Sequence, residues 1–472
     1  MKRLFVAFLA ISIIACNEKP KVEYAIVTGK IENSQVKLAT IDGADFKAEI
    51  NIEEDGTFLD TIQITENNFY ALTIGREYTP LYLIKGDSLH VDVDATKFDE
   101  SLKYSGEGAV ENNYLAAKML NESKGIENPV AFYSMEEADF KTKVKTIKNT
   151  NNSLLVNLND ADEDFISSEK QNLVYDEYNM LNNYKQRHGY YTKKEDFKIS
   201  EDFFPAELKD MDFDDSKAYR SSNSYKNIAF DNLLTKLFDT IGDDISNVTV
   251  DQLQIIEEAK IPALKNDAID YLSSFLVTPS NPNMASVYTY LKDNTTKEET
   301  KKKLTETFEK NKDLVKGKPS PQFVNYENHK GGELSLADLK GKYVYVDVWA
   351  TWCGPCIKEI PSLKEVEKKF HNENIEFVSI STDDGRGYKG QTNEEKALLA
   401  KEGWKNMIMD KELGGIQLYA DNAFNSSFMN DYQVNSIPRF ILIDPNGNIV
   451  SADAPRPSDP KLVELLEREL KM

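Results

Sequence analysis

The sequence predicts a multidomain protein, with an N-terminal β-sandwich-like domain, a central α-helical domain and a C-terminal α/β domain. Three observations predict this order. Short β-branched and aromatic runs fill the first part of the chain, apolar residues at helical spacing fill the middle, and strand-like and helix-like segments alternate in the last third. A length of 472 residues agrees with two to four domains.

Residues 1–15 are expected to be a signal segment. A basic start precedes a short apolar run, residues 4–14, which ends near Cys16. This is a secretory pattern, and the run is too short to span a membrane. Residues 13–16 resemble a bacterial lipobox, which implies a lipid anchor on Cys16; an ordinary signal peptide is the alternative. The expected location is the cell envelope, as a periplasm-facing lipoprotein of the inner or outer membrane.

Residues 22–108 form the expected β-rich domain. Its β-branched and aromatic runs are separated by breaks such as Asp55-Gly56, which have turn chemistry. Many short strands at regular spacing are typical of a β-sandwich. The segment 53–62 predicts a hairpin around Asp55-Gly56. The expected strands cover residues 25–29, 35–40, 49–52, 57–64, 69–75, 80–84 and 88–93.

Residues 109–311 form the expected α-helical domain. Gly and Pro become rare there, and apolar residues recur at helical spacing, for example at Leu233, Leu234, Leu237 and Phe238. Charged residues and Asn occupy the other positions. The Tyr and Phe residues of this region are expected to pack in its core.

Residues 315–472 form the expected α/β domain, and residues 315–323 are its linker to the helical region. Strands and helices alternate after the linker, which is typical of a sheet with helices on both faces. The expected strands cover residues 343–349, 375–381, 439–444 and 449–452. The expected helices cover residues 359–370, 394–403, 422–431 and 460–470.

The charge of the chain argues against nucleic acid as a partner. The formal net charge is -22, whereas phosphate binding requires a basic surface. The acidic run 210–215 lacks the alternating oxygen ligands and the tight-turn glycine of a calcium loop, so we expect a solvated loop there.

Two of the three cysteines, Cys353 and Cys356, lie between an expected strand and an expected helix. A thiolate at a helix N-terminus has a lowered pKa, and a second thiol two residues further on can attack a mixed disulfide. We therefore expect Cys353, the more exposed, to attack and Cys356, the more buried, to resolve. A zinc site lacks further ligands, because the four histidines are scattered. A purely structural disulfide is the remaining alternative.

The segment VDVWATWCGPCIKEIP, residues 346–361, resembles the active site of the thioredoxin superfamily. Residues 352–356, WCGPC, match the thioredoxin redox motif residue for residue. More narrowly, the segment is similar to exported, membrane-tethered thiol-disulfide oxidoreductases of the TlpA/ResA type. The resemblance covers about the last third of the chain and implies a thioredoxin fold there. The β-rich and helical regions before it look like those of some lipoproteins of Bacteroidetes.

The resemblance implies three residues that contact substrate. The Ile437–Pro438 bond is expected to be cis and to face the cysteines, with the backbone of Ile437 binding an extended substrate; an ordinary trans proline at a strand start is the alternative. Trp352 is expected to shield the attacking sulfur and to contact the partner, although core packing alone also explains a tryptophan.

The resemblance also implies roles for two acids. Asp347 takes the place of the buried acid of thioredoxins, which accepts the proton of Cys356 directly or through water. A satisfied structural acid is the alternative. Glu359, one helical turn after Cys356, takes the place of an acid that tunes the thiols and substrate access. A solvated helix glutamate is the alternative.

The expected function is reduction of disulfides in exported proteins by two-step exchange. In this family Gly354-Pro355 is associated with reductants, and a membrane thiol-transfer protein is the implied electron donor. No metal, flavin or nucleotide cofactor is implied. A peroxidase is less favoured, because peroxiredoxins place Thr or Ser where this chain has Ala350, and a disulfide isomerase is also less favoured. The alternative of another class is a surface-binding or scaffolding lipoprotein whose redox domain is secondary.

Overall fold

The computed structural model describes residues 22–43, 46–64, 68–209, 211–242 and 245–471. The expected signal segment and Cys16 lie outside these residues. The chain divides into two compact units, residues 1–232 and 233–472. This division falls inside one helix, α8 (Asn223–Ile241). The domain boundaries expected from the sequence therefore stay predictions.

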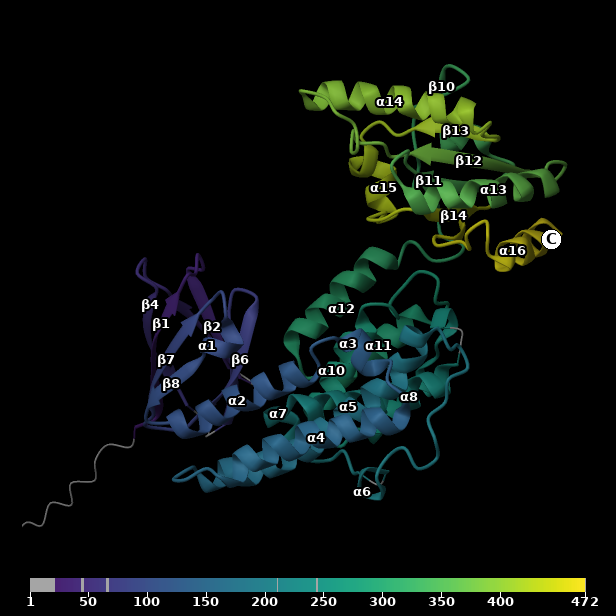
Figure 1. Cartoon of the computed structure of the whole chain (residues 1–472). Helices are drawn as coiled ribbons and strands as arrows, with labels where there is room; N and C mark the ends of the chain where they lie inside the picture. The colour runs from purple at the N-terminus through teal and green to yellow at the C-terminus, as the bar shows by residue number, and fades with distance from the viewer. Residues whose placement is uncertain (1–21, 44–45, 65–67, 210, 243–244, 472) are drawn as a thin grey trace, which may run out of the picture. The chain divides into compact units, whose positions relative to one another are not determined.

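The first unit begins with two four-stranded sheets (Figure 1). One has the order β4-β1-β7-β8 and the other the order β3-β2-β5-β6. Apolar side chains of both sheets form one core, for example Val27, Leu72 and Val91. The strand-rich first region is therefore confirmed. Its strands are β1 (Tyr24–Glu32), β2 (Leu38–Gly43), β3 (Phe46–Asn51), β4 (Thr57–Gln63), β5 (Asn68–Ile74), β6 (Glu77–Leu83), β7 (Ser88–Asp94) and β8 (Lys103–Gly106).

The hairpin expected around Asp55-Gly56 is wrong. A turn is present there, because Gly56 has a φ of 83°. However, β3 before it and β4 after it belong to different sheets, and β4 pairs with β1. Turn residues determine where a strand ends, whereas the pairing partner of the next strand is chosen by the faces that must be buried.

Helices fill the rest of the first unit. A charged group lies buried among them, where the ammonium of Lys118 is 3.0 Å from a carboxylate oxygen of Glu169 and 2.7 Å from one of Asp176. These partners compensate the charge that burial would otherwise leave unpaired. The helices are α1 (Phe98–Ser101), α2 (Ala109–Gly125), α3 (Pro129–Tyr133), α4 (Glu137–Val156), α5 (Glu163–Thr192), α6 (Ala206–Lys209) and α7 (Ser216–Ser221).

The second unit begins with a helical part. Apolar side chains from several helices, such as Leu237, Leu272 and Leu291, form its core. The helical middle of the chain is thus confirmed. After α8 its elements are η1 (Ile245–Asn247), α9 (Val250–Leu253), η2 (Gln254–Glu258), α10 (Pro262–Ser273), α11 (Met284–Asn294) and α12 (Glu298–Asn311).

A seven-stranded mixed sheet forms the remainder of the second unit, in the order β10-β9-β13-β12-β11-β14-β15. β11 (Tyr343–Trp349) lies between parallel β12 (Ile375–Ser381) and antiparallel β14 (Arg439–Ile443). Its other elements are β9 (Tyr326–Asn328), β10 (Glu333–Leu334), η3 (Leu336–Leu339), α13 (Gly354–Lys369), α14 (Asn393–Asp410), β13 (Ile416–Tyr419), η4 (Ala423–Asn425), α15 (Ser427–Asp431), β15 (Ile449–Ser451) and α16 (Pro460–Leu470).

Helices cover both faces of this sheet. Leu363 of α13 and Leu466 of α16 share a core with Tyr345 of β11. Val346 directly follows Tyr345 in β11 and points to the opposite face of the sheet. There it packs in a core with Phe428 of α15. Successive residues of a strand point to opposite faces, so a central strand must be apolar throughout. The expected alternation of strands and helices is confirmed.

Several details differ from the expectation. The helix expected at residues 422–431 is split into η4 and α15, β13 is an additional strand, and α13 begins before residue 359. The expected linker, residues 315–323, is bonded to the sheet: Gly317 N–H donates to Ile449 O, and Ser320 N–H donates to Gly447 O. The strand β13 was not predicted from the sequence, because its four residues are too few to show a strand period.

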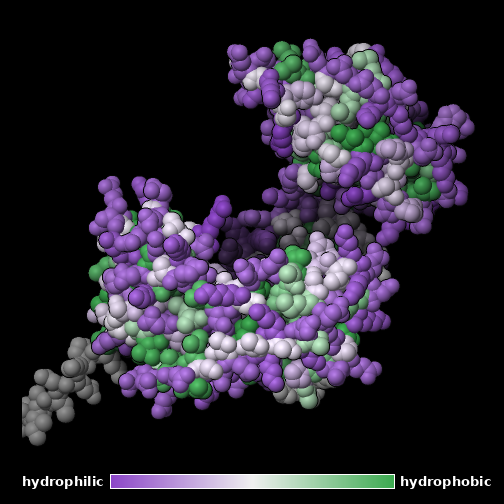
Figure 2. Space-filling view, in the orientation of Figure 1, coloured by the Kyte–Doolittle hydropathy of each residue, from purple (hydrophilic) through white to green (hydrophobic). Residues whose placement is uncertain are grey.

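Among the described residues, no helix is both long and apolar enough to cross a membrane. Figure 2 shows that hydrophilic residues cover most of the visible face, with hydrophobic residues in scattered groups. This agrees with a chain in which 29% of residues are charged.

Candidate active site

The two cysteines lie where β11 gives way to α13. Cys353 is the N-cap of α13, and its Sγ accepts a hydrogen bond of 3.2 Å from the backbone N–H of Cys356. Pro355 stands in the first helical turn, where backbone N–H groups lack helical partners and a missing N–H costs little. The predicted position of the pair at a helix N-terminus is confirmed. Such a position stabilises a thiolate.

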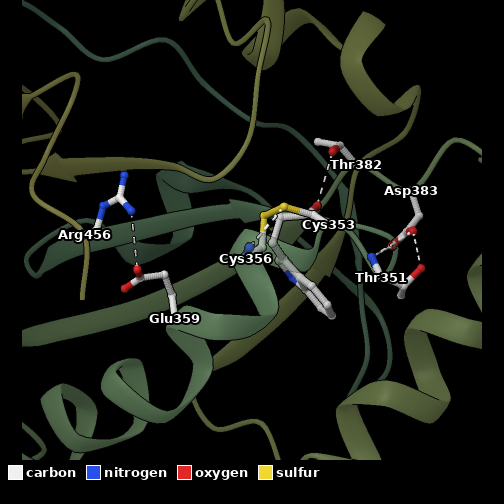
Figure 3. Close-up of a disulfide and its surroundings, with 8 residues drawn as sticks. Thr351, Cys353, Cys356, Glu359, Thr382, Asp383 and Arg456 are labelled. Atoms are coloured by element: carbon white, nitrogen blue, oxygen red, sulfur yellow. Dashed lines mark hydrogen bonds and ion pairs between the residues drawn. A yellow bond between two sulfur atoms is a disulfide. The ribbon is translucent and has the colours of Figure 1, made fainter. Parts of the chain in front are cut away.

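A disulfide joins Cys353 and Cys356, whose Cα atoms are 5.3 Å apart (Figure 3). The two residues are 3% and 4% exposed, and they pack in one cluster with Trp349 and Trp404. Both cysteines are almost fully buried in this oxidised form, so the expected greater exposure of Cys353 is not seen. The physical reason is that its sulfur is held by the disulfide and by the first turn of the helix.

The Ile437–Pro438 peptide bond is cis, as the resemblance implies. Pro438 directly precedes β14, which pairs with β11, the strand that leads to the cysteines. Ile437 packs against the cluster that contains both cysteines. The chain thus brings two segments that are far apart in sequence to the same end of the sheet.

Asp347 and Cys356 line one small cavity between β11 and α13. The cavity measures ≈ 10 Å³, which is about the space that one water requires. Burial raises the pKa of Asp347 to about 7, although the Ser379 hydroxyl donates to Asp347 Oδ2 at 3.4 Å and opposes the shift. The acid expected beside the resolving thiol therefore shares a cavity with it, and it can exchange a proton near neutral pH.

Glu359 has partners outside the redox motif. Its carboxylate accepts hydrogen bonds from the backbone N–H and the hydroxyl of Ser458, both at 2.9 Å. The guanidinium of Arg456 lies 3.7 Å away (Figure 3). The residue is 8% exposed, so it is not a solvated helix glutamate. It joins α13 to the loop before α16.

Trp352 is covered by a loop that sequence reasoning missed. The guanidinium carbon of Arg386 lies 4.4 Å from the centroid of the Trp352 ring, where a cation is attracted by the aromatic face. The indole Nε1 is buried and has no hydrogen-bond partner among the described residues. The loop after β12 therefore contributes to the surface around the motif.

A buried carboxylate fixes the turn before the cysteines. The backbone N–H of Thr351 donates to both carboxylate oxygens of Asp383, at 3.0 and 3.1 Å, and its hydroxyl donates at 2.6 Å (Figure 3). The Ser381 hydroxyl donates to Asp383 at 2.7 Å. Burial raises the pKa of Asp383, and the hydrogen bonds from the Thr351 and Ser381 hydroxyls oppose part of this shift. Sequence reasoning missed Asp383. This residue follows the buried strand β12 at its carboxyl end, where binding and catalytic sites often form in such sheets.

Within the ranges that the structure describes, no group of three or more His, Cys, Asp or Glu residues could hold a metal ion. The chemistry of the site lies in the two sulfur atoms and the acids beside them. A pair of thiols that alternates with a disulfide transfers two electrons without a cofactor.

Comparisons with known proteins agree with this geometry. A family model described as Redoxin matches residues 315–466. A curated relative named thiol-disulfide oxidoreductase ResA, from a strain of Bacillus cereus, is 30% identical over 134 residues, which are 28% of this chain and 66% of the relative. The chain thus spans slightly less than two thirds of the length of that relative.

Solved structures are similar to about a third of this chain. The thioredoxin domain of a thiol-disulfide oxidoreductase from Bacteroides vulgatus is 26% identical and covers 33% of this chain and 99% of its own, with a TM-score of 0.27. A thiol-disulfide oxidoreductase from Bacteroides fragilis is also 26% identical and covers 32% of this chain and 100% of its own, with a TM-score of 0.26.

Proposed function

Because the C-terminal part of this chain belongs to the thioredoxin superfamily, as a redoxin domain similar to ResA-type thiol-disulfide oxidoreductases, we propose that the whole protein reduces disulfides in exported proteins. The observation that carries this proposal is the Cys353–Cys356 pair at the N-terminus of α13. A dithiol there is both nucleophilic and able to close into a disulfide.

The reaction has two exchange steps. In the first, the Cys353 thiolate attacks one sulfur of the substrate disulfide, and the other substrate sulfur leaves and takes a proton. In the second, Cys356 loses its proton and attacks Cys353 Sγ, so that the second substrate sulfur leaves. Asp347 is the base for this second step, because it lines the same cavity as Cys356. Two electrons pass from the protein to the substrate.

Three residues are proposed to contact the substrate. Ile437 and Pro438 lie at the strand start that adjoins the cysteine cluster, and the backbone of Ile437 is proposed to pair with an extended segment of substrate. Trp352 is proposed to pack on the same segment. Glu359 is proposed to act more indirectly, by holding the loop at Ser458 against α13 near the pair.

The direction of electron flow and the location are further proposals. Gly354-Pro355 between the cysteines favours a reductase, which a membrane thiol-transfer protein keeps reduced. The apolar start of the sequence supports export, and Cys16 is the proposed site of a lipid anchor in the cell envelope.

The first test measures the reduction potential of the pair and the turnover of insulin as a model disulfide substrate. We expect a strongly negative potential and turnover that Cys353→Ser abolishes. Cys356→Ser is expected to retain the first step only and to accumulate a mixed disulfide with the substrate. Cys16→Ser serves as the matched control for the loss of a cysteine outside the redox motif. A pair that does not cycle between dithiol and disulfide would refute the proposed function.

A further inference from the structure

A second carboxyl group shares the cavity with Cys356 and Asp347. Glu367 lies on α13, about three helical turns after Cys356, and it lines the same cavity. The Glu367 side chain is half-buried. Asp347 is likewise partly exposed, and it lies on β11, between β12 and β14. Glu367 is therefore a second partly exposed carboxyl group at this cavity.

Two glycines leave space for the Glu367 carboxylate at this place. A Cβ atom at Gly414 would collide with Glu367 Oε2, and one at Gly415 would come within 3.1 Å of Oε1. Gly415 also has a φ of 60°, which other residues rarely adopt. The backbone between α14 and β13 thus leaves space for the Glu367 carboxylate. A side chain at position 414 would occupy that space.

A buried amide completes the cavity. Gln417 is 4% exposed, and its Nε2 donates to Gly414 O at 2.8 Å. Its Oε1 is buried and has no donor among the described residues. Buried acceptors nearly always receive a hydrogen bond, and the cavity of ≈ 10 Å³ has room for about one water. A water placed in this cavity would supply the donor that Gln417 Oε1 lacks.

Burial is the main reason why the pKa of each of the two acids is raised. Burial raises the pKa of Glu367, and the ammonium of Lys364 lowers it in part. Glu367 and Glu359 in turn raise the pKa of Asp347, against the hydroxyl of Ser379. Two carboxylates in one low-dielectric space do not both ionise readily.

Tyr345, also on β11, donates its phenol O–H to Pro455 O at 2.8 Å, and burial raises the pKa of this phenol well above the ordinary value. It therefore stays neutral and does not compete for the proton.

We propose that Glu367 is the residue through which the proton of Cys356 leaves for solvent, after Asp347, with Gln417 orienting the water between them. This inference rests on the proposed function. In the resolving step the Cys356 sulfur bonds to Cys353 Sγ, and the bond from Cys353 to the substrate sulfur breaks. The proton passes from Cys356 to Asp347, then to Glu367 and to bulk water, and the leaving substrate sulfur takes a proton from solvent. Glu367 is a positioning residue, because it acts through Asp347.

The test follows the oxidation of the reduced full-length protein by glutathione disulfide, using tryptophan fluorescence, from pH 5 to 9. For Glu367→Gln we expect a rate roughly tenfold lower near neutral pH, less than a direct general base contributes. We also expect the pH profile to move to lower pH, because Asp347 loses a negative neighbour. Imidazole is expected to restore the rate in proportion to its concentration, because it carries the proton instead.

Two variants separate this role from a structural one. Glu365→Gln changes an exposed glutamate of the same helix and should leave rate and profile unchanged. Gly414→Ala keeps both carboxyl groups but displaces that of Glu367, and should reproduce the dependence on imidazole. An unchanged pH profile in Glu367→Gln would overturn the inference, as would a lower rate that imidazole does not restore. Wild-type protein that glutathione disulfide never oxidises would instead refute the proposed function.

Discussion

At the scale of the residue, burial changes the chemistry of Asp347 most. Its pKa is raised from 3.8 to about 7, chiefly by burial. Well below pH 3.8 the group is neutral in both the folded and the unfolded chain. As the pH rises toward 7, only the unfolded chain loses the proton, so the folded domain loses stability over this window. Asp347 is thus retained at a thermodynamic cost, which is typical of functional acids.

We therefore predict that Asp347→Asn makes the redox domain more stable at pH 8, by at most roughly 4 kcal/mol at 1.36 kcal/mol per pKa unit. The gain should shrink toward zero as the pH falls to 4. Urea unfolding followed by tryptophan fluorescence measures it, because all three tryptophans of the chain lie at positions 349, 352 and 404. Glu365→Gln is the control. A gain independent of pH would contradict the assignment of the shift to Asp347.

At the scale of the element, the redox motif depends on a contact between two strand ends. Thr351 follows β11, and Asp383 follows β12; the carboxylate of Asp383 accepts from the backbone and the hydroxyl of Thr351. The parallel pairing of β11 and β12 brings their carboxyl ends to one edge of the sheet. The turn that presents Cys353 is therefore fixed from the neighbouring strand as well as by its own helix.

Asp383→Ala is expected to destabilise the redox domain by about 2–4 kcal/mol, because Thr351 and Ser381 lose a buried, charged acceptor. The same fluorescence-detected unfolding measures this loss, and the rate of insulin reduction should fall with it. Glu365→Gln changes an exposed glutamate of α13 and should have little effect. Equal effects of the two variants would show that the buried network does not support the motif.

At the scale of the whole molecule, the redox machinery occupies a minor share of the chain. Every residue that the proposed mechanism uses lies between Asp347 and Ser458, whereas the sheets and helices before residue 315 carry none of them. These regions remain the place to look for substrate recognition or scaffolding, as in a surface-binding lipoprotein.

We predict that the separately produced fragment 315–472 reduces insulin at the rate of the full chain, because it contains all the reacting groups. Its rate with the physiological substrate should be lower if the preceding regions bind that substrate. The measurement compares both rates for fragment and full chain, after circular dichroism shows that the fragment is folded. A folded fragment that is inactive on insulin would place a required group before residue 315.

Much of the redox domain could be predicted because its signals are local. β11, β12 and α16 have the bounds expected from runs of apolar residues and from helical spacing. The hairpin at Asp55-Gly56 and the strand β13 could not be predicted in this way. A turn does not specify a pairing partner, and four residues do not establish a period.

The sequence by itself determined the redox chemistry of this protein, because two cysteines at this spacing before a helix form a reactive dithiol wherever the helix lies. Only the tertiary structure decided what surrounds that dithiol. Thr351 and Asp383 stand 32 positions apart, and Glu367 meets Gly414 across the fold. Such contacts depend on which strands pair and which faces are buried, and no local pattern of residues records that choice.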